Sequence, residues 1–346
     1  MTSWRAKLKG IFMLFRVLAV MVWAFTAGTI ATAAVAFNGL EVDWNVFAFV
    51  LLMAALVQGY PAHIINEIFD WQSGSDRPAL SEPSTDEGQR SGRRPIAGGS
   101  KVIMAGLLSI AELWRLFYLT TAAVIALTIL VGVAHSANLL WFIVPGYLLC
   151  IFYTLPPFRF AYRPFLGEYC GGFSGIVLLV SGAYYAQTFE LPFAILLLAF
   201  GLGFHYAAIM VFFHYIDFSR DSRATPPKRT SVVYLGLEGS RRYALANTAI
   251  GTAIFIYLTL AAQPAYVWLA AQGLLIFYCH YRVRPADHAS IVHWGKCMTY
   301  GVLVAGLAIG LMASREFAWM IVVYVIGYWS HKRFGKLRPV TALSHV

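Results

Sequence analysis

The sequence is dominated by apolar runs that are long enough to cross a bilayer. These runs recur from Gly10 to Ser330, and the charged residues gather between them. A membrane-spanning helix needs about 20 consecutive apolar residues, and its backbone must be satisfied internally. The pattern therefore predicts an all-α polytopic transmembrane helix bundle. With 59% hydrophobic and 12% charged residues, the chain is not a water-soluble globule.

Apolar windows predict nine to ten helices. The windows lie near residues 11–36, 45–66, 115–134, 139–155, 167–187, 192–215, 244–262, 265–281, 297–313 and 317–331. Because no soluble segment interrupts them, we interpret residues 1–346 as a single transmembrane domain. The first apolar stretch is longer than that of a secretory signal peptide, so we interpret it as a retained helix.

The distribution of basic residues predicts the orientation. If the N-terminus is cytoplasmic, 23 of the 26 Lys and Arg residues fall in cytoplasmic segments, and only Arg315 lies in an outer loop. By the positive-inside rule, both termini are predicted to face the cytoplasm, with the chain in the inner membrane. An even number of helices is therefore favoured over nine. The basic excess serves orientation, and no nucleic-acid partner is expected.

A first acidic segment, NEIFDWQSGSD, stands where the second predicted helix meets a long cytoplasmic loop. Asn66 and Asp70 are four residues apart, so they share a face of a helix. Gly74 allows the chain to turn, which would bring Asp76 back toward that face. The loop side of the second helix is therefore predicted to hold a cluster of oxygen ligands.

A second acidic segment, DFSRD, repeats this spacing at the end of the sixth predicted helix, with Asp217 and Asp221 four residues apart. Two carboxylate clusters at one membrane face are costly unless cations neutralise them. Mg²⁺ suits this need, because it binds one or two carboxylates and leaves other positions to substrate phosphates. The predicted metal ligands are Asp70, Asp76, Asp217 and Asp221.

Basic side chains complete a predicted clamp for a diphosphate. Lys228 and Arg229 follow the second acidic segment, and Arg159 and Arg163 belong to YTLPPFRFAYR. Together with Asn66, they are the predicted diphosphate-binding residues. Any one of these charged side chains could be a solvated loop residue. The presence of two acidic clusters at one face favours a site.

In order and spacing, these residues resemble the UbiA superfamily of intramembrane prenyltransferases. The segment from Asn66 to Asp76 is similar to the first family signature, N-D-x-x-D-x-x-x-D, and Asp217 to Asp221 is similar to the second, D-x-x-x-D. YTLPPFRFAYR, LGEYCGGFSG and KRTSVVYLG resemble further family segments. The resemblance covers Val57 to Gly236, about half of the chain.

Within the family, the first segment resembles the menaquinone branch, the 1,4-dihydroxy-2-naphthoate polyprenyltransferases. That branch has an extra glycine, as in Phe69 to Asp76, and a GGS-like segment, as in residues 98–100. Glu67 stands where the family usually has Asp, so Asp70 and Asp76 are better candidates for metal ligands than Glu67.

The resemblance implies Mg²⁺-dependent transfer of a prenyl group from an allylic prenyl diphosphate to an aromatic acceptor in the membrane. It implies that Asp70 and Asp217 are catalytic, with metal and cations stabilising the leaving diphosphate on the cytoplasmic side. The ring of Tyr153 would stabilise an allylic cation that is shielded from water. We expect the loop from Trp71 to Lys101 to close over the site as a lid.

Several alternatives stay open. The acceptor could be 1,4-dihydroxy-2-naphthoate, 4-hydroxybenzoate, homogentisate, a chlorin or a lipid phosphate, and prenyl length and oligomeric state are not readable. A secondary transporter is a second class, because acidic residues in helices often mark transport sites. The clustering of acidic residues at one face argues against a transporter, and two intact acidic segments argue against a silent scaffold.

The remaining polar residues receive structural interpretations. Glu112 and Glu168 are expected at the cytoplasmic surface, either solvated or capping a helix. Gln58 and His63 are expected to make hydrogen bonds within the pocket, and His205 with a neighbouring helix.

Overall fold

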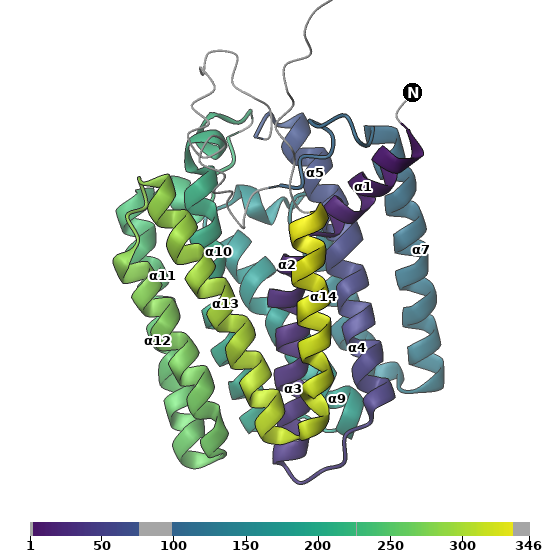
Figure 1. Ribbon diagram of the computed structural model, residues 1–346, viewed down its shortest axis with the longest axis vertical. Helices are drawn as coiled ribbons and strands as arrows, with labels where there is room; N and C mark the ends of the chain where they lie inside the picture. The colour runs from purple at the N-terminus through teal and green to yellow at the C-terminus, as the bar shows by residue number, and fades with distance from the viewer. Residues whose placement is uncertain (1–2, 76–98, 226, 335–346) are drawn as a thin grey trace, which may run out of the picture.

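A computed structural model describes residues 3–75, 99–225 and 227–334, and all regular structure in these ranges is helical (Figure 1). The predicted all-α bundle is thus confirmed. Seven helical segments in the described ranges are long and apolar enough to cross a membrane. They are Trp4–Phe37, Trp44–Gln72, Ile110–Ala134, Gly167–Thr188, Phe193–Arg223, Ser231–Ala261 and His288–Ala313.

Three shorter segments complete the chain order, so each of the ten predicted windows holds a helix. They are η3 with α8 (Ala137–Leu139, Leu140–Phe152), η6 with α12 (Pro264–Tyr266, Val267–Arg282), and η7 with α14 (Arg315–Ala318, Trp319–Phe334). Three long helices extend past their windows into polar sequence: α10 (Phe193–Arg223), α11 (Ser231–Ala261) and α13 (His288–Ala313). The extension of α10 brings the second acidic segment onto a helix.

The first two passes are not continuous α-helices. The first consists of α1 (Trp4–Phe15), α2 (Val17–Val20), η1 (Met21–Phe25) and α3 (Thr26–Phe37), and the second of α4 (Trp44–Val57), η2 (Gln58–Ala62) and α5 (His63–Gln72). Arg16 has a left-handed backbone, with φ of 48°, and separates α1 from α2. Pro61 removes a backbone donor within the π-helix η2.

A close approach of these two passes depends on a glycine. A Cβ atom on Gly59 would lie 2.4 Å from the ring of Phe15. The absence of a side chain at Gly59 therefore lets the first pass lie against η2, directly below the start of α5. This contact positions the helix that carries the first acidic segment.

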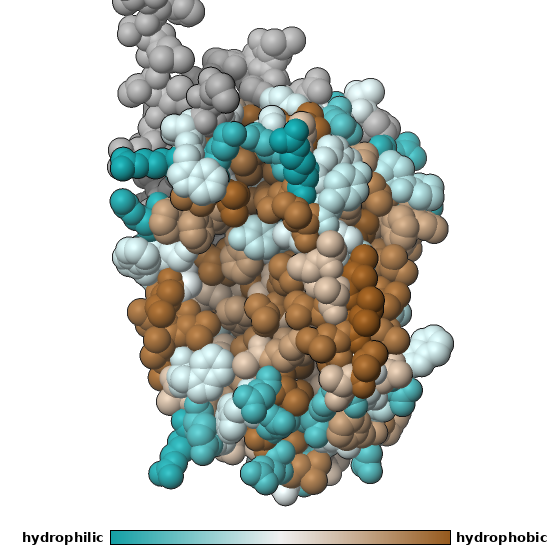
Figure 2. Space-filling model, turned by 90° about the vertical axis from the view of Figure 1, so that its right-hand side faces the viewer, coloured by the Kyte–Doolittle hydropathy of each residue, from teal (hydrophilic) through white to brown (hydrophobic). Residues whose placement is uncertain are grey.

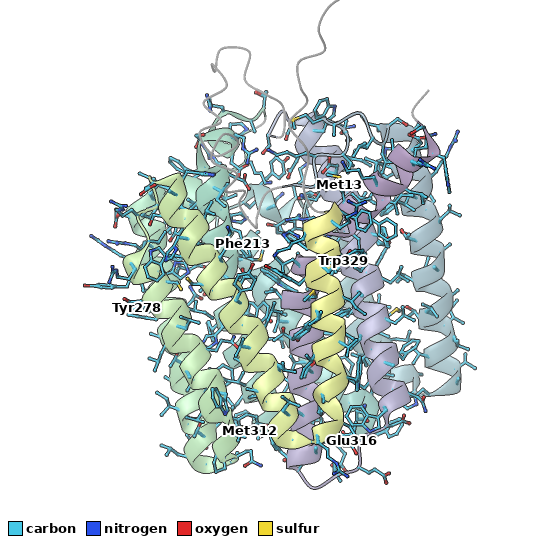
Figure 3. All side chains as sticks on the ribbon, in the orientation of Figure 1. Met13, Phe213, Tyr278, Met312, Glu316 and Trp329 are labelled. Carbon is cyan, nitrogen blue, oxygen red and sulfur yellow. The ribbon has the colours of Figure 1, made fainter. Side chains whose placement is uncertain are left out.

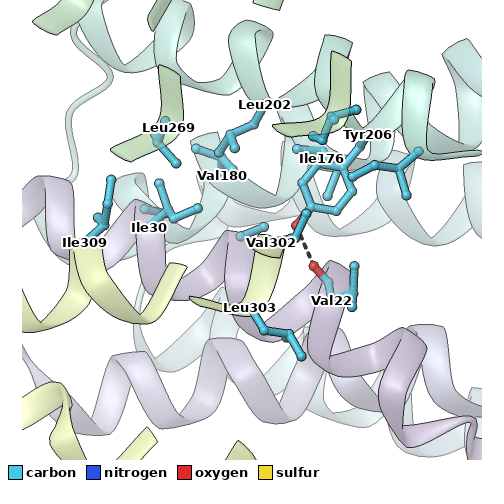
Figure 4. Packing of buried hydrophobic residues seen from close by; sticks show 14 of the residues in the cluster. Val22, Ile30, Ile176, Val180, Leu202, Tyr206, Leu269, Val302, Leu303 and Ile309 are labelled. Carbon is cyan, nitrogen blue, oxygen red and sulfur yellow. Dashed lines mark hydrogen bonds between the residues drawn. The ribbon is translucent and has the colours of Figure 1, made fainter. Parts of the chain in front are cut away.

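The core lies where the first pass packs against later helices: α9 (Gly175–Thr188), α10 and α13 (His288–Ala313). Buried side chains such as Ile30, Val180 and Leu202 interdigitate there, and the Tyr206 hydroxyl donates to the Val22 carbonyl (Figure 4). The sequence of α3 is rich in alanine, which permits close packing in a lipid environment where hydrophobic burial gives little driving force.

The surface of the bundle agrees with a membrane environment. Apolar side chains form a broad band across the middle of the face seen in Figure 2, with polar side chains at both ends. Phe12 stacks on Phe334 with ring centroids 5.0 Å apart. The described start and end of the chain therefore lie at the same end of the bundle, next to α5, as an even number of passes requires (Figure 1).

Candidate active site

An elongated cavity of about 700 Å³ lies among the first two passes, α8, α9 and α10. Apolar side chains of α4, α8 and α9 line most of its length, and Phe213 of α10 is on its wall (Figure 3). One end lies at the level of α5 and the end of α10, and its polar lining includes Asn66, Asp70, Ser75, His214, Asp217 and Lys228. The cavity therefore combines a charged end with an apolar channel.

Asp70 stands one turn after Asn66 on α5, and its carboxylate is buried. The ammonium group of Lys228 lies 3.0 Å from Oδ1 and 2.9 Å from Oδ2 of Asp70. Tyr162, in the short helix η4 (Phe160–Tyr162), donates to Oδ1 of Asp70 at 3.2 Å. Burial raises the pKa of Tyr162, so its hydroxyl remains protonated and acts as a donor.

Lys228 lies in the loop between α10 and α11 and is also buried. Burial lowers the pKa of Lys228, but the carboxylates of Asp221 and Asp70 raise it by more, so the pKa lies well above its usual range. The lysine therefore stays charged. Its backbone N–H donates to the carbonyl oxygen of Asp221 at 3.1 Å, which fixes the loop to the end of α10.

Asp221 connects the two acidic segments. Ser75 donates to Oδ1 of Asp221 at 2.7 Å, and the N–H of Thr225 donates to the carbonyl oxygen of Ser73 at 2.8 Å. Oδ2 of Asp221 is buried and has no hydrogen-bond partner among the residues that the structure describes. Asp217, one turn earlier, lines the cavity and pairs with Arg220.

Asp76, the remaining predicted ligand, lies outside the described residues, as does most of the predicted lid, residues 76–98. Within the described ranges, no three His, Cys, Asp or Glu side chains are grouped closely enough to hold a metal ion. The carboxylates of Asp70, Asp217 and Asp221 meet at one end of the bundle without forming a tight triad.

The predicted cations divide into two groups. The guanidinium of Arg159 lies over the rings of Phe69 and Tyr162, at 5.6 and 5.4 Å from their centroids. Its Nε atom is buried and has no hydrogen-bond partner in the described part of the chain. None of Arg159, Arg163 and Arg229 is part of the cavity lining. Arg163 and Arg229 are exposed, and Arg163 donates to the carbonyl oxygen of Pro157 at 3.3 Å. The structure thus brings Lys228 and Arg159 toward Asp70 and leaves the other two on the surface.

Tyr153 follows α8 and lines the cavity, and it belongs to a buried hydrogen-bond network that sequence reasoning missed. Its hydroxyl lies 3.2 Å from Nε2 of His214, and Nδ1 of His214 lies 3.1 Å from Oε1 of Glu168. The prediction that Glu168 is solvated or caps a helix is wrong, because its side chain is 0% exposed. The loop of residues 153–166 packs against the start of the π-helix η5 (Gly167–Ser174), where a Cβ atom on Gly167 would lie 3.3 Å from Cα of Ala161. His214 precedes Asp217 by three residues, and this spacing is the sequence signal that could have placed it near the site.

Glu67 has a structural role. Its carboxylate accepts hydrogen bonds from Ser100 Oγ at 2.5 Å, Lys101 N at 3.0 Å and Ile103 N at 3.2 Å. These contacts fix the segment that follows the long loop, and they direct Glu67 away from the cavity lining. This agrees with the preference for Asp70 as a metal ligand.

The other polar predictions have clear outcomes. Glu112 forms a capping box with Ser109 at the start of α7 (Ile110–Ala134), as expected. Gln58 and His63 line the cavity, and Gln58 donates to the carbonyl oxygen of Ala19 at 3.4 Å. His205 contacts the neighbouring helix α11, as expected, through Thr252 at 3.3 Å.

The sequence model of the UbiA prenyltransferase family matches residues 21–300. This is most of the chain, and the protein therefore belongs to the UbiA prenyltransferase family. This family membership confirms the predicted enzyme class, a prenyltransferase, and argues against the alternative of a secondary transporter. No curated protein sequence matches the chain significantly.

The fold is also similar to solved structures. A UbiA homologue from Archaeoglobus fulgidus bound to GPP and Mg²⁺ is 18% identical, with a TM-score of 0.61 over 87% of this chain and 99% of that chain. A digeranylgeranylglyceryl phosphate synthase is 14% identical, with a TM-score of 0.57 over 89% and 98%. A UbiA homologue from Aeropyrum pernix K1 is 16% identical, with a TM-score of 0.56 over 83% and 96%.

Proposed function

We propose that the protein transfers a prenyl group from an allylic prenyl diphosphate to a hydroxylated aromatic acceptor, such as the quinone precursor 1,4-dihydroxy-2-naphthoate. This proposal rests on how polar and apolar side chains are distributed along the cavity. Most of the cavity is lined by apolar side chains, and one end is lined by the buried Asp70 and Lys228. An amphiphile with a diphosphate head and an isoprenoid tail has the same polarity. The ligands named for the A. fulgidus homologue, GPP and Mg²⁺, support it.

The donor set fits Mg²⁺. Asp221 has a buried carboxylate oxygen with no partner in the described residues, and Asp70 and Asp217 present carboxylates to the cavity. Hard cations of this kind prefer such oxygen ligands. We assign Asp70, Asp217 and Asp221, with Asp76, as the residues that would hold the ion. When bound, Mg²⁺ supplies positive charge to the diphosphate as it leaves.

The basic residues of the chain bind the same head group. Lys228 is held at the charged end of the cavity by Asp70, so its ammonium group is already positioned for a phosphate oxygen. Arg159 has an unpaired buried Nε donor within the described residues and stacks against the rings beside Asp70. Asn66 lines the cavity and offers a further polar group. Exposed Arg163 and Arg229 are not included in this binding set.

The walls of the cavity protect the reacting carbon. Tyr153 and Phe213 place aromatic rings on the wall, and ring faces attract cations. The apolar lining along α4, α8 and α9 excludes water, which would otherwise capture an allylic cation. Tyr153 therefore belongs to the proposed catalytic residues, together with Asp70 and Asp217.

We place the charged end of the cavity and both termini on the cytoplasmic side of the inner membrane. The support is the strong excess of Lys and Arg in the loops at that end of the bundle. A water-soluble aromatic acceptor would then enter from the cytoplasm, while the prenyl diphosphate approaches from the lipid.

The test uses purified protein in lipid, with Mg²⁺, prenyl diphosphates of several lengths and a panel of acceptors. Mass spectrometry should detect prenylated 1,4-dihydroxy-2-naphthoate and little product with an alcohol such as a glycerol phosphate. Product with the glycerol phosphate alone would overturn the aromatic acceptor. The absence of product with every acceptor would overturn prenyl transfer itself.

A further inference from the structure

A buried hydrogen-bond chain leads from the cavity wall into the protein and is separate from the hydrogen bonds of the acidic cluster. It starts at the Tyr153 hydroxyl, passes through His214 on α10 and Glu168 on η5, and ends at Ser231 on α11. The Ser231 hydroxyl donates to Oε2 of Glu168 at 2.7 Å. Within the described residues, no hydrogen bond joins this chain to the carboxylates of Asp70, Asp217 or Asp221.

The contacts determine the direction of the chain. The Ser231 hydroxyl accepts from the N–H of Phe165 at 2.7 Å and donates to Glu168, so Glu168 acts as an acceptor. The other carboxylate oxygen of Glu168 then accepts from Nδ1–H of His214. When His214 is neutral, Nε2 is then the acceptor for the Tyr153 hydroxyl. In its neutral form the histidine is thus held in the tautomer that can take a proton from the cavity side.

This arrangement is costly for a purely structural contact. Glu168 is 0% exposed, His214 is 8% exposed, and both belong to membrane-spanning segments. Ionisable groups at such positions are expensive and commonly mark proton or substrate sites. A carboxylate that orients a histidine, which in turn contacts a hydroxyl at a reaction cavity, is the arrangement by which proteins activate a hydroxyl.

We propose that Tyr153, His214 and Glu168 form a proton relay for the acceptor, an inference that rests on the proposed prenyl transfer. Tyr153 faces the cavity and would receive the proton of the acceptor hydroxyl, while its own proton passes to Nε2 of His214. Glu168 stabilises the resulting imidazolium. Tyr153 is the catalytic residue of the relay, and His214 and Glu168 are positioning residues that act through it.

The step balances. The bond between C1 of the prenyl group and the diphosphate oxygen breaks, and its electron pair leaves with the diphosphate. The deprotonated acceptor uses a ring electron pair to form the new bond to C1. The ring carbon then loses its hydrogen to the diphosphate as a proton, and the acceptor oxygen regains its proton from Tyr153 as His214 returns its proton to the tyrosine. The relay ends as it began, and one proton leaves with the diphosphate.

The relay selects a chemical class of acceptor. A phenolic hydroxyl has a pKa of about 10, as in tyrosine, and can transfer its proton toward an imidazole during the reaction. An aliphatic alcohol is a much weaker acid and gains little from such a base. The relay therefore favours a hydroxylated aromatic ring over the alcohol of a lipid phosphate precursor.

The test compares acceptors of different acidity in His214→Gln, Glu168→Gln and Tyr153→Phe. Removal of a general base typically costs a factor of about 10² to 10⁴. With an ordinary phenolic acceptor, kcat of His214→Gln should fall about 100-fold, while KM for the prenyl diphosphate stays within about twofold. With a fluorinated acceptor of lower hydroxyl pKa, the loss should shrink to less than about tenfold. Added imidazole should restore part of the activity of His214→Ala.

The matched control is His205→Gln, which changes another buried histidine of α10 that contacts Thr252 and does not line the cavity. It should show no dependence on the acidity of the acceptor. An equal loss with both acceptors in all three relay variants would overturn the relay and leave prenyl transfer intact. If a thermal melting curve shows that His214→Gln does not fold, Glu168→Gln and Tyr153→Phe allow the same comparison between acceptors. A wild-type protein without activity on any aromatic acceptor would overturn the proposed function as well.

Discussion

The ammonium group of Lys228 contacts both carboxylate oxygens of Asp70, at 3.0 and 2.9 Å, across 158 residues of sequence. Both side chains are buried at the charged end of the cavity. The protein thus carries an internal counter-charge for one of its predicted metal ligands. Removal of one partner of such a pair leaves an uncompensated buried charge, which is more costly than loss of the attraction alone.

Lys228→Met should lower the free energy of unfolding by about 3 to 5 kcal/mol, because Asp70 remains buried without its partner. Thermal or denaturant unfolding in detergent measures this change. Arg229→Met is the matched control, since Arg229 is the exposed neighbour in sequence and should change stability by less than about 0.5 kcal/mol. If both substitutions change the free energy of unfolding equally, the ion pair stabilises the protein no more than a charge on the surface does.

The same pair predicts a pH dependence. The pKa of Lys228 is raised in the folded protein, so its contribution to stability is complete below the unfolded value of about 10.4 and is lost as pH rises toward the folded value. The difference in melting temperature between the wild type and Lys228→Met should therefore not decline as pH rises from about pH 6 to pH 9. A difference that declines steadily within this range would contradict the raised pKa.

Asp70→Asn and Asp217→Asn should each lower kcat by well over about tenfold, because each removes a charge directed at metal and diphosphate. Asp217→Asn should keep a normal melting curve, whereas Asp70→Asn should also melt at a lower temperature, because it leaves the buried Lys228 without its partner. EDTA should abolish activity, and Mg²⁺ should restore it. Asp43→Asn is a suitable control, because Asp43 caps α4 (Trp44–Val57) with its side chain. Full activity in EDTA would contradict the metal requirement.

Glu67→Gln tests whether the carboxylate of Glu67 has a structural role or is a metal ligand. An amide has one acceptor oxygen, so it cannot keep all three hydrogen bonds from Ser100, Lys101 and Ile103. We expect a loss of stability of about 1 to 3 kcal/mol, while the Mg²⁺ concentration for half-maximal activity stays within about twofold. A strong rise in that concentration would instead make Glu67 a ligand.

Cysteine labelling tests the orientation. After replacement of the four native cysteines, Ser3→Cys and Ser344→Cys should both react with an impermeant reagent from the cytoplasmic side. Ser344 lies outside the described residues. Labelling of position 344 from the opposite side would contradict the ten-segment order.

The sequence predicted those features that depend on local periodicity. All ten apolar windows hold helices, and the spacing of Asn66 with Asp70 places both on α5 and on the cavity wall. Hydropathy over about 20 residues and a spacing of four on a helix are both short-range properties, which explains this success.

The environment of individual side chains was not predictable in the same way. Lys228 and Arg229 are adjacent, yet one is buried beside Asp70 and the other is exposed. Glu168 is buried, and its carboxylate contacts His214 and Ser231, which come from two other helices. These outcomes depend on contacts between distant segments, which no local pattern contains.

The first pass of the bundle is held by helices from the far end of the chain. Helix α3 packs against α9 and α13, the Thr26 and Tyr324 hydroxyls lie 3.4 Å apart across 298 residues, and Phe12 stacks on Phe334. At 5 to 20 residues per second, a ribosome needs about 15 to 60 s to make the chain between Thr26 and Tyr324. During that time the alanine-rich face of α3 has lipid or an insertion factor as its neighbour. The packing of the first pass is therefore completed only after α14 has been made and joins α1 and α2.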